Sequence, residues 1–139
     1  MKILIAIDGS TSSLAALRFV HKHRIGGEQV TITLIHVDVP LNGYVVDHLD
    51  PVAVERYHAD NTRSALRAAR RAMKQSNLPH DEVTRIGDPA AEIIEVARRG
   101  RFDMIAMGSH GWGALASTLL GSVVQKVLSH SKIPVLVTR

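Results

Sequence analysis

The chain opens with Met1-Lys2-Ile3-Leu4-Ile5-Ala6-Ile7-Asp8-Gly9-Ser10. This apolar, isoleucine-rich run predicts a buried strand from Lys2 to Asp8, which the turn-forming Asp8-Gly9-Ser10 ends. Ser10 or Thr11 can then cap a helix. A fully buried strand that leads directly into a helix is typical of a parallel sheet with helices on both faces.

The same alternation of strand and helix continues to the last residue. Further apolar runs predict strands at 29–37, 82–86, 103–107 and 133–138. Helices are expected at 10–24, from 50 to about 77, at 88–100 and from 122, and residues 38–50 are expected to form a loop. The sequence therefore predicts one domain, 1–139, with a doubly wound α/β fold: a five-stranded parallel sheet in the order 3-2-1-4-5.

This strand order has a consequence for function. The first and fourth strands meet at the switch point, where open α/β sheets bind their ligands. The ends of these strands carry Asp8-Gly9-Ser10 and Gly108-Ser109-His110-Gly111. The two most polar, glycine-marked strand ends are therefore expected to lie side by side.

The most informative motif is Gly108-x2-Gly111, nine residues, and then Gly121-Ser122 at a helix start. Glycines let the backbone approach oxygen atoms closely, and the positive end of a helix dipole favours anions. The motif predicts phosphate binding in preference to a merely flexible loop. There is no Walker A motif and no G-x-G-x-x-G after the first strand. A response-regulator receiver would need an aspartate where the third strand ends at Ile86-Gly87.

With Ser131-Lys132-Ile133-Pro134-Val135-Leu136-Val137 after it, this motif resembles the signature of the universal stress protein family, ATP-binding type. The stretches Met1–Ser10, Leu34–Val37 and Gly87–Pro89 resemble other parts of that family. The resemblance implies bound ATP, with Mg²⁺ or Mn²⁺ held mainly by the phosphates, and no metal site in the protein itself.

The resemblance also implies which residues contact the nucleotide. Asp8 is expected near the ribose or adenine, and the backbone of Val37 at the base. Ribose and phosphates are expected to contact Gly108, Ser109, Gly111, Gly121, Ser122 and Val123. The neighbouring residues Ile7, Gly9, Met107 and His110 complete the expected site.

Several of these residues have simpler interpretations. Asp8 could merely cap the following helix. His110 is disfavoured as a catalytic base because no Asp or Glu adjoins it, and no catalytic residue is expected. Trp112 could cover the nucleotide or contact a partner. The basic stripe on the long helix is expected to be a solvated face rather than a nucleic-acid site; it consists of Arg63, Arg67, Arg70, Arg71 and Lys74.

Composition limits the remaining possibilities. The net charge of +4 favours anionic partners, whereas 4% aromatic residues leave few platforms for stacking bases. The lack of cysteine, and of an apolar run long enough for a membrane span, predicts a cytoplasmic protein.

The leading hypothesis is an ATP-binding stress-response regulator whose nucleotide-bound state is recognised by a protein partner. The alternatives are an enzyme (a slow Mg-dependent ATPase or an adenylyl-transferring relative) and a nucleic-acid-associated module. A homodimer through strand 133–138 is also predicted, because that bare edge strand invites pairing.

Overall fold

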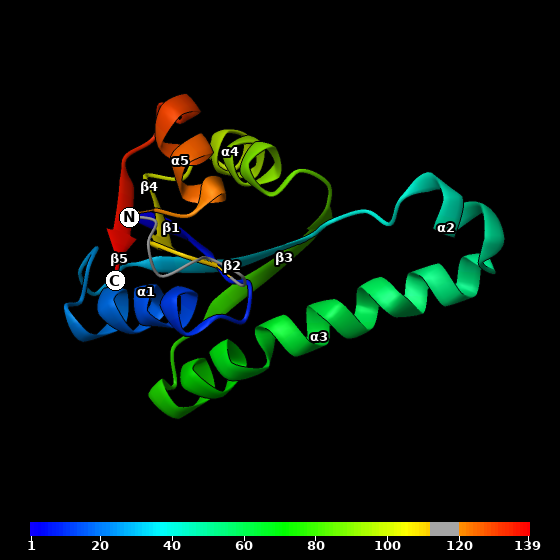
Figure 1. Cartoon of the computed structure of the whole chain (residues 1–139). Helices are drawn as coiled ribbons and strands as arrows, with labels where there is room; N and C mark the ends of the chain where they lie inside the picture. Colours follow the sequence, from blue (N-terminus) through cyan, green and yellow to red (C-terminus); the bar gives the residue numbers. More distant parts are fainter. Residues whose placement is uncertain (112–119) are drawn as a thin grey trace.

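The computed structural model describes residues 1–111 and 120–139. Five parallel strands form one sheet in the predicted order β3-β2-β1-β4-β5. Helices α1 and α3 cover one face of the sheet and α4 and α5 the other (Figure 1). The strands are β1 (Lys2–Ala6), β2 (Thr31–Asp38), β3 (His80–Ile86), β4 (Met104–Gly108) and β5 (Val135–Thr138). The helices are α1 (Thr11–Lys22), α2 (Gly43–His48), α3 (Pro51–Ser76), α4 (Pro89–Arg99) and α5 (Ser122–His130).

Alternate residues of β1 supply two separate cores. Ile3 and Ile5 pack with Leu17 and Leu66 beneath α1 and α3. Leu4, which points to the opposite face, packs with the helices α4 and α5. All three β1 side chains are fully buried. Because successive strand residues point to opposite faces, a sheet covered on both sides needs an uninterrupted apolar run here.

The helix ends follow their local capping chemistry. Ser10, not Asp8, is the N-cap of α1, and its Oγ accepts a hydrogen bond from the amide of Ser13 at 3.1 Å. Asp88 caps α4 through the amide of Ala91 at 3.0 Å, ahead of Pro89. Asn77 ends α3 in the left-handed conformation, with φ of 51°.

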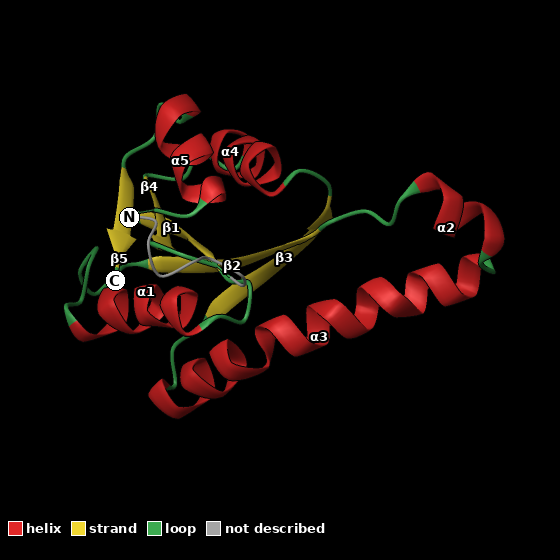
Figure 2. Cartoon of the chain, viewed as in Figure 1, coloured by secondary structure: helices red, strands yellow, loops and turns green. Residues whose placement is uncertain are grey.

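The expected loop at 38–50 is the main difference from the prediction. It contains α2, which Asn42 caps through the amide of Val45. Asn42-Gly43 lies within this expected loop, but it begins a helix because the Asn side chain satisfies an amide of the first turn. Together, α2 and the first turns of α3 stand clear of the sheet (Figure 2).

Within the described residues, no helix combines the length and the apolar character needed to cross a membrane.

Candidate functional site

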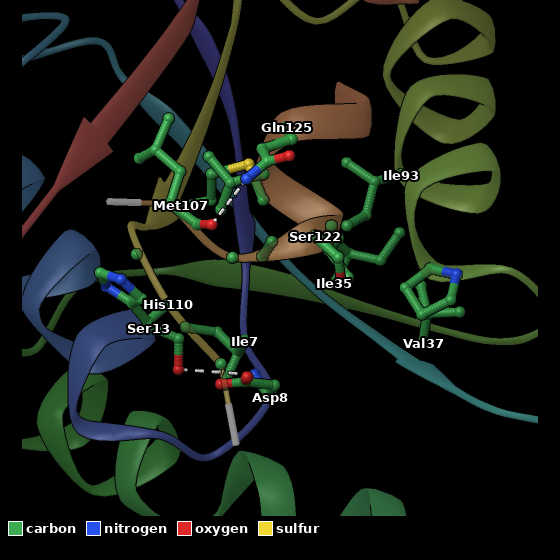
Figure 3. A pocket seen from close by; sticks show the side chains of 18 of the residues that line it. Ile7, Asp8, Ser13, Ile35, Val37, Ile93, Met107, His110, Ser122 and Gln125 are labelled. Atoms are coloured by element: carbon green, nitrogen blue, oxygen red, sulfur yellow. Dashed lines mark hydrogen bonds between the residues drawn. The ribbon is translucent and has the colours of Figure 1, made fainter. Parts of the chain in front are cut away.

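A cavity of about 580 Å³ lies at the carboxyl ends of β1, β2 and β4, beside the start of α5. This is the predicted switch point, since β1 pairs with β2 on one side and with β4 on the other. Figure 3 shows side chains from these strand ends and from the first turn of α5 around the cavity.

Ten of the twelve predicted contact residues line the cavity. They are Ile7, Asp8, Val37, Met107, Gly108, His110, Gly111, Gly121, Ser122 and Val123. Gly9 and Ser109 do not belong to its lining. Trp112, whose role was left open, lies outside the described residues.

Asp8 supports the helix cap without being the cap. Its Oδ1 accepts hydrogen bonds from the amide and the hydroxyl of Ser10, at 2.9 and 2.6 Å. The second carboxylate oxygen, Oδ2, lies next to Gly111 in the glycine loop. The carboxylate therefore joins the start of α1 to the loop after β4, and it lines the cavity as well.

A buried histidine on β2 fixes the backbone just after β1. Nδ1 of His36 lies 2.9 Å from the carbonyl oxygen of Ile7 and donates a hydrogen bond to it. His36 is buried, with 7% of its surface exposed. This contact holds in place the backbone that positions Asp8.

The three glycines of the motif have different surroundings. A Cβ added at Gly108 would collide with the backbone of Ser12, 2.5 Å from its carbonyl oxygen. At Gly111 the added Cβ would lie 2.6 Å from Oδ2 of Asp8. At Gly121 it would have ordinary contacts, the nearest at 3.4 Å. Gly108 is thus required for the close approach of α1 to β4, whereas the fold places no such demand on Gly121.

Ser109 is buried next to the cavity and hydrogen-bonds to the segments around it. It is 2% exposed, its amide donates to the carbonyl of Thr138 at 2.7 Å, and its carbonyl accepts from the amide of Gly121 at 2.8 Å. Its Oγ lies 2.8 Å from Nδ1 of His110. These bonds join the end of β4 to β5 and to the start of α5. Direct contact of Ser109 with a nucleotide remains a prediction.

Gly9 also has a structural function. It has φ of +85°, and an added Cβ would lie 3.1 Å from Cα of Ala65 on α3. A side chain is disfavoured both by this backbone conformation and by the close approach of α3. Its expected contact with nucleotide likewise remains a prediction.

The first turn of α5 presents amide groups at the cavity. Gly121 is its N-cap, and among residues 1–111 and 120–139 no side chain caps this end of the helix. Ser122 and Val123, the first two residues of α5, both line the cavity. Because the first amides of a helix have no partner within the helix and carry its positive end, this wall of the cavity suits an anion.

Another part of the cavity wall is apolar and was largely missed from the sequence. Ile35, Val39, Pro89 and Ile93 line it together with Val37. They come from β2, the segment after β2, and the start of α4. Val37 was predicted at the base from the sequence. The helix start at Asp88-Pro89 was predicted as well, but its position beside the cavity depends on the packing of α4.

Charged side chains are few at the site. Asp8 and His110 are the ionisable residues of the described lining, which contains no lysine or arginine. The described residues also contain no group of three His, Asp or Glu side chains arranged to hold a metal ion. Backbone amides are therefore the groups of the described lining that suit an anionic ligand.

The fold and the site define a doubly wound α/β protein with a switch-point cavity that has one amide-rich and one apolar wall. The model of the universal stress protein family matches residues 1–139. The chain belongs to this family.

Curated relatives and solved structures agree with this assignment. The chain is 30% identical over 138 residues to the "Universal stress protein in QAH/OAS sulfhydrylase 3'region" of Thermus aquaticus, covering 99% of this chain and 97% of the relative. It is 28% identical over 146 residues to the universal stress protein YxiE of Bacillus subtilis, with 99% and 98% coverage. The solved structure of protein MJ0577 of Methanocaldococcus jannaschii superposes with a TM-score of 0.81 at 26% identity, covering 99% of this chain and 94% of that one.

Proposed function

We propose that the switch-point cavity binds ATP and that the protein acts as a stress-response regulator whose nucleotide-bound state is read by a protein partner. One observation carries this proposal: the first turn of α5 and the glycines after β4 line the same cavity as Asp8. Two solved family members have nucleotide ligands in their descriptions, an Arabidopsis thaliana protein with AMP and another with cAMP.

The chemistry of the two walls suggests how the nucleotide is oriented. The phosphates lie at the amides of Ser122 and Val123, where the helix dipole stabilises negative charge. Asp8 repels phosphate but accepts hydrogen bonds from hydroxyl groups, so it faces the ribose. The base lies against the apolar wall formed by residues such as Val37 and Ile93.

A divalent cation fits this arrangement when it arrives with the nucleotide. The described lining contains no cationic side chain, so Mg²⁺ or Mn²⁺ held mainly by the phosphates would supply the missing positive charge. We therefore expect ATP to bind more tightly with Mg²⁺ than in its absence.

The variant Gly121→Val tests the position of the phosphates. Gly121 has φ of −68° and room for a Cβ, so the fold should accept valine while the side chain enters the anion-binding wall. Calorimetric titration with Mg-ATP should show at least a tenfold loss of affinity. Gly43→Val, at the exposed start of α2 with no atom within 4 Å of the added Cβ, is the matched control. Equal affinity of Gly121→Val and the parent would refute the phosphate assignment.

A further inference from the structure

No residue of 39–60, a segment that we call the arm, is buried by the rest of the chain. The arm comprises the segment after β2, all of α2 and the first turns of α3, and it extends beyond the sheet (Figure 1). No residue of α2 is buried, and the first buried residue of α3 is Ala65. Short helices are marginal in water unless an apolar face packs against something. A surface from outside the chain is therefore expected to cover the arm.

The arm concentrates the exposed apolar surface of the protein. Six of the ten large apolar side chains that are exposed in the described residues lie between 39 and 57. Tyr44, on α2, is 75% exposed. The other five are Val39, Val46, Leu49, Val52 and Tyr57. Clustered exposed apolar side chains mark an interaction surface, whereas isolated ones need no explanation.

Charge indicates which partner covers the arm. Residues 39–60 contain four carboxylates and one arginine, a formal charge of −3, so the rest of the chain carries +7. In the described part of the chain no ion pair is recorded for Asp47 or Glu55. The surface that complements the arm is basic with apolar contacts, and the body of this same chain is basic.

A groove of the required character lies beside the root of the arm, between α3 and the edge strand β3. Arg63, Arg70 and Arg85 line it, and Ile86, which is 53% exposed, adds an apolar contact. Ala59, Thr62 and Thr84 complete much of the wall. Each of the three arginines also forms an ion pair: Arg63 with Asp60, Arg70 with Glu82, and Arg85 with Glu92.

The root of the arm is fixed by a polar clasp. The Oδ2 of Asp38, at the end of β2, accepts hydrogen bonds from Nδ1 of His58 at 2.7 Å and from Nδ2 of Asn61 at 3.0 Å. The side chains of Asp38 and His58 are only 14% and 11% exposed. These two bonds fix the direction in which the arm leaves the body.

We infer that a second copy of this chain is the occupant: the arm of each copy lies in the groove between α3 and β3 of the other. Arm and groove adjoin, because Glu55 and His58 of the arm form one wall of the groove. A two-fold axis near this wall would bring each acidic arm onto the basic groove of its partner and would cover the open edge of β3. This interface is separate from the edge of β5, at the other end of the sheet.

Cross-linking between copies tests this geometry. The chain has no cysteine, so each introduced one is unique. Isotope-labelled Tyr44→Cys protein mixed with unlabelled Ile86→Cys protein should give a mixed cross-link with a short bis-maleimide at micromolar concentration. Phe19→Cys, an exposed apolar position on α1, replaces Ile86→Cys as the control and should give none. Absence of the Tyr44–Ile86 cross-link, or an equal yield with the control, would overturn the inference.

A charge swap tests why the partner is a second copy. Asp47→Lys, placed in the Tyr44→Cys chain, should lower the cross-link yield several-fold at low salt. Arg63→Glu with Arg85→Glu, placed in the Ile86→Cys chain, should restore the yield when the two chains are mixed. Glu28→Lys makes the same charge change away from the arm and should leave the yield unchanged. If Asp47→Lys has no effect, or the swap gives no recovery, complementary charge does not recruit the second copy and the inference fails.

Discussion

The Cα of Gly111 is so close to Asp8 that an added Cβ would lie 2.6 Å from the carboxylate oxygen Oδ2. The other oxygen of this carboxylate, Oδ1, accepts the two hydrogen bonds from Ser10 at the start of α1. Gly111, the second glycine of the motif, is thus required for the position of the Asp8 side chain at the end of the neighbouring strand β1. Asp8 and Gly111, which are 103 residues apart in the sequence, are therefore in direct contact.

This contact predicts that Gly111→Ala and Asp8→Ala are coupled. Alanine at 111 would push the Asp8 side chain away from its position, so each single variant should weaken ATP binding. The double variant should bind about as weakly as Asp8→Ala alone, because the displaced carboxylate is already absent. Calorimetry on the four proteins measures this coupling. Strictly additive losses would show that Gly111 acts on the nucleotide independently of Asp8.

Asp8→Ala also separates binding from capping. Loss of the bonds that hold the N-cap residue Ser10 should lower stability by about 1 kcal/mol, the scale of a lost cap. ATP affinity should fall at least tenfold. Asp8→Asn keeps an acceptor oxygen for Ser10 and should recover most of the stability. Thermal unfolding and ATP titration of both variants check this. Unchanged affinity in Asp8→Ala would leave Asp8 with its structural role alone.

Gly108→Ala should damage the fold more than Gly121→Ala does. The Cβ at 108 meets the backbone of Ser12, which cannot rotate away, whereas at 121 the contacts are ordinary. Overpacking of this kind costs roughly 1–3 kcal/mol. Denaturant unfolding of the two variants measures the difference in the free energy of unfolding. Equal stability would mean that α1 shifts away from β4 at little cost.

The clasp at Asp38 predicts a pH dependence of stability. Burial would raise the pKa of Asp38, but the hydrogen bonds from His58 and Asn61 outweigh it and hold this pKa below its ordinary value. A carboxyl whose pKa is lowered in the folded state stabilises the fold above its unfolded pKa of about 4. That stability, on the order of 1–2 kcal/mol for charge-assisted hydrogen bonds, is lost as the pH falls through the lowered folded pKa.

The matched variants are Asp38→Asn and Asp81→Asn. Urea unfolding at pH 7 should show Asp38→Asn less stable than the parent, and the difference should shrink below pH 4. Asp81 serves as the control, because it is an exposed residue on β3 whose side chain has no hydrogen bond within the described residues. A stability difference for Asp38→Asn that stays constant down to pH 2.5 would contradict the ionic contribution.

The edge of β5 predicts a second interface between copies. The carbonyls of Pro134 and Thr138 accept bonds from residues 105 and 109, so the backbone groups of the alternate residues Val135 and Val137 point to the open edge. Val135→Pro removes one outward donor without breaking the ladder to β4 and should halve the molar mass measured by light scattering. Val135→Ala, which keeps the donor, should match the parent. An unchanged mass in Val135→Pro would contradict pairing at this edge.

The sequence by itself determined the strand order and the position of the cavity. Buried strands such as Ile3–Ile5 need apolar side chains on both faces, and right-handed crossovers then leave few orders for five such strands. Caps such as Asp88-Pro89 and Asn77 act within a few residues of their own position, so those helix ends were also predictable. The switch point followed from the order, and with it the meeting of Asp8 and the Gly108–Gly111 segment.

Only the tertiary structure decided what the individual residues at that point contact. Gly108 meets Ser12, and Gly9 meets Ala65, because helices from distant parts of the chain approach the strand ends closely. The apolar wall of the cavity depends on where α4 packs, and the arm is exposed because no residue of α2 becomes buried. Local sequence specifies caps and burial, but distances between residues far apart in the chain exist only once the layers have packed.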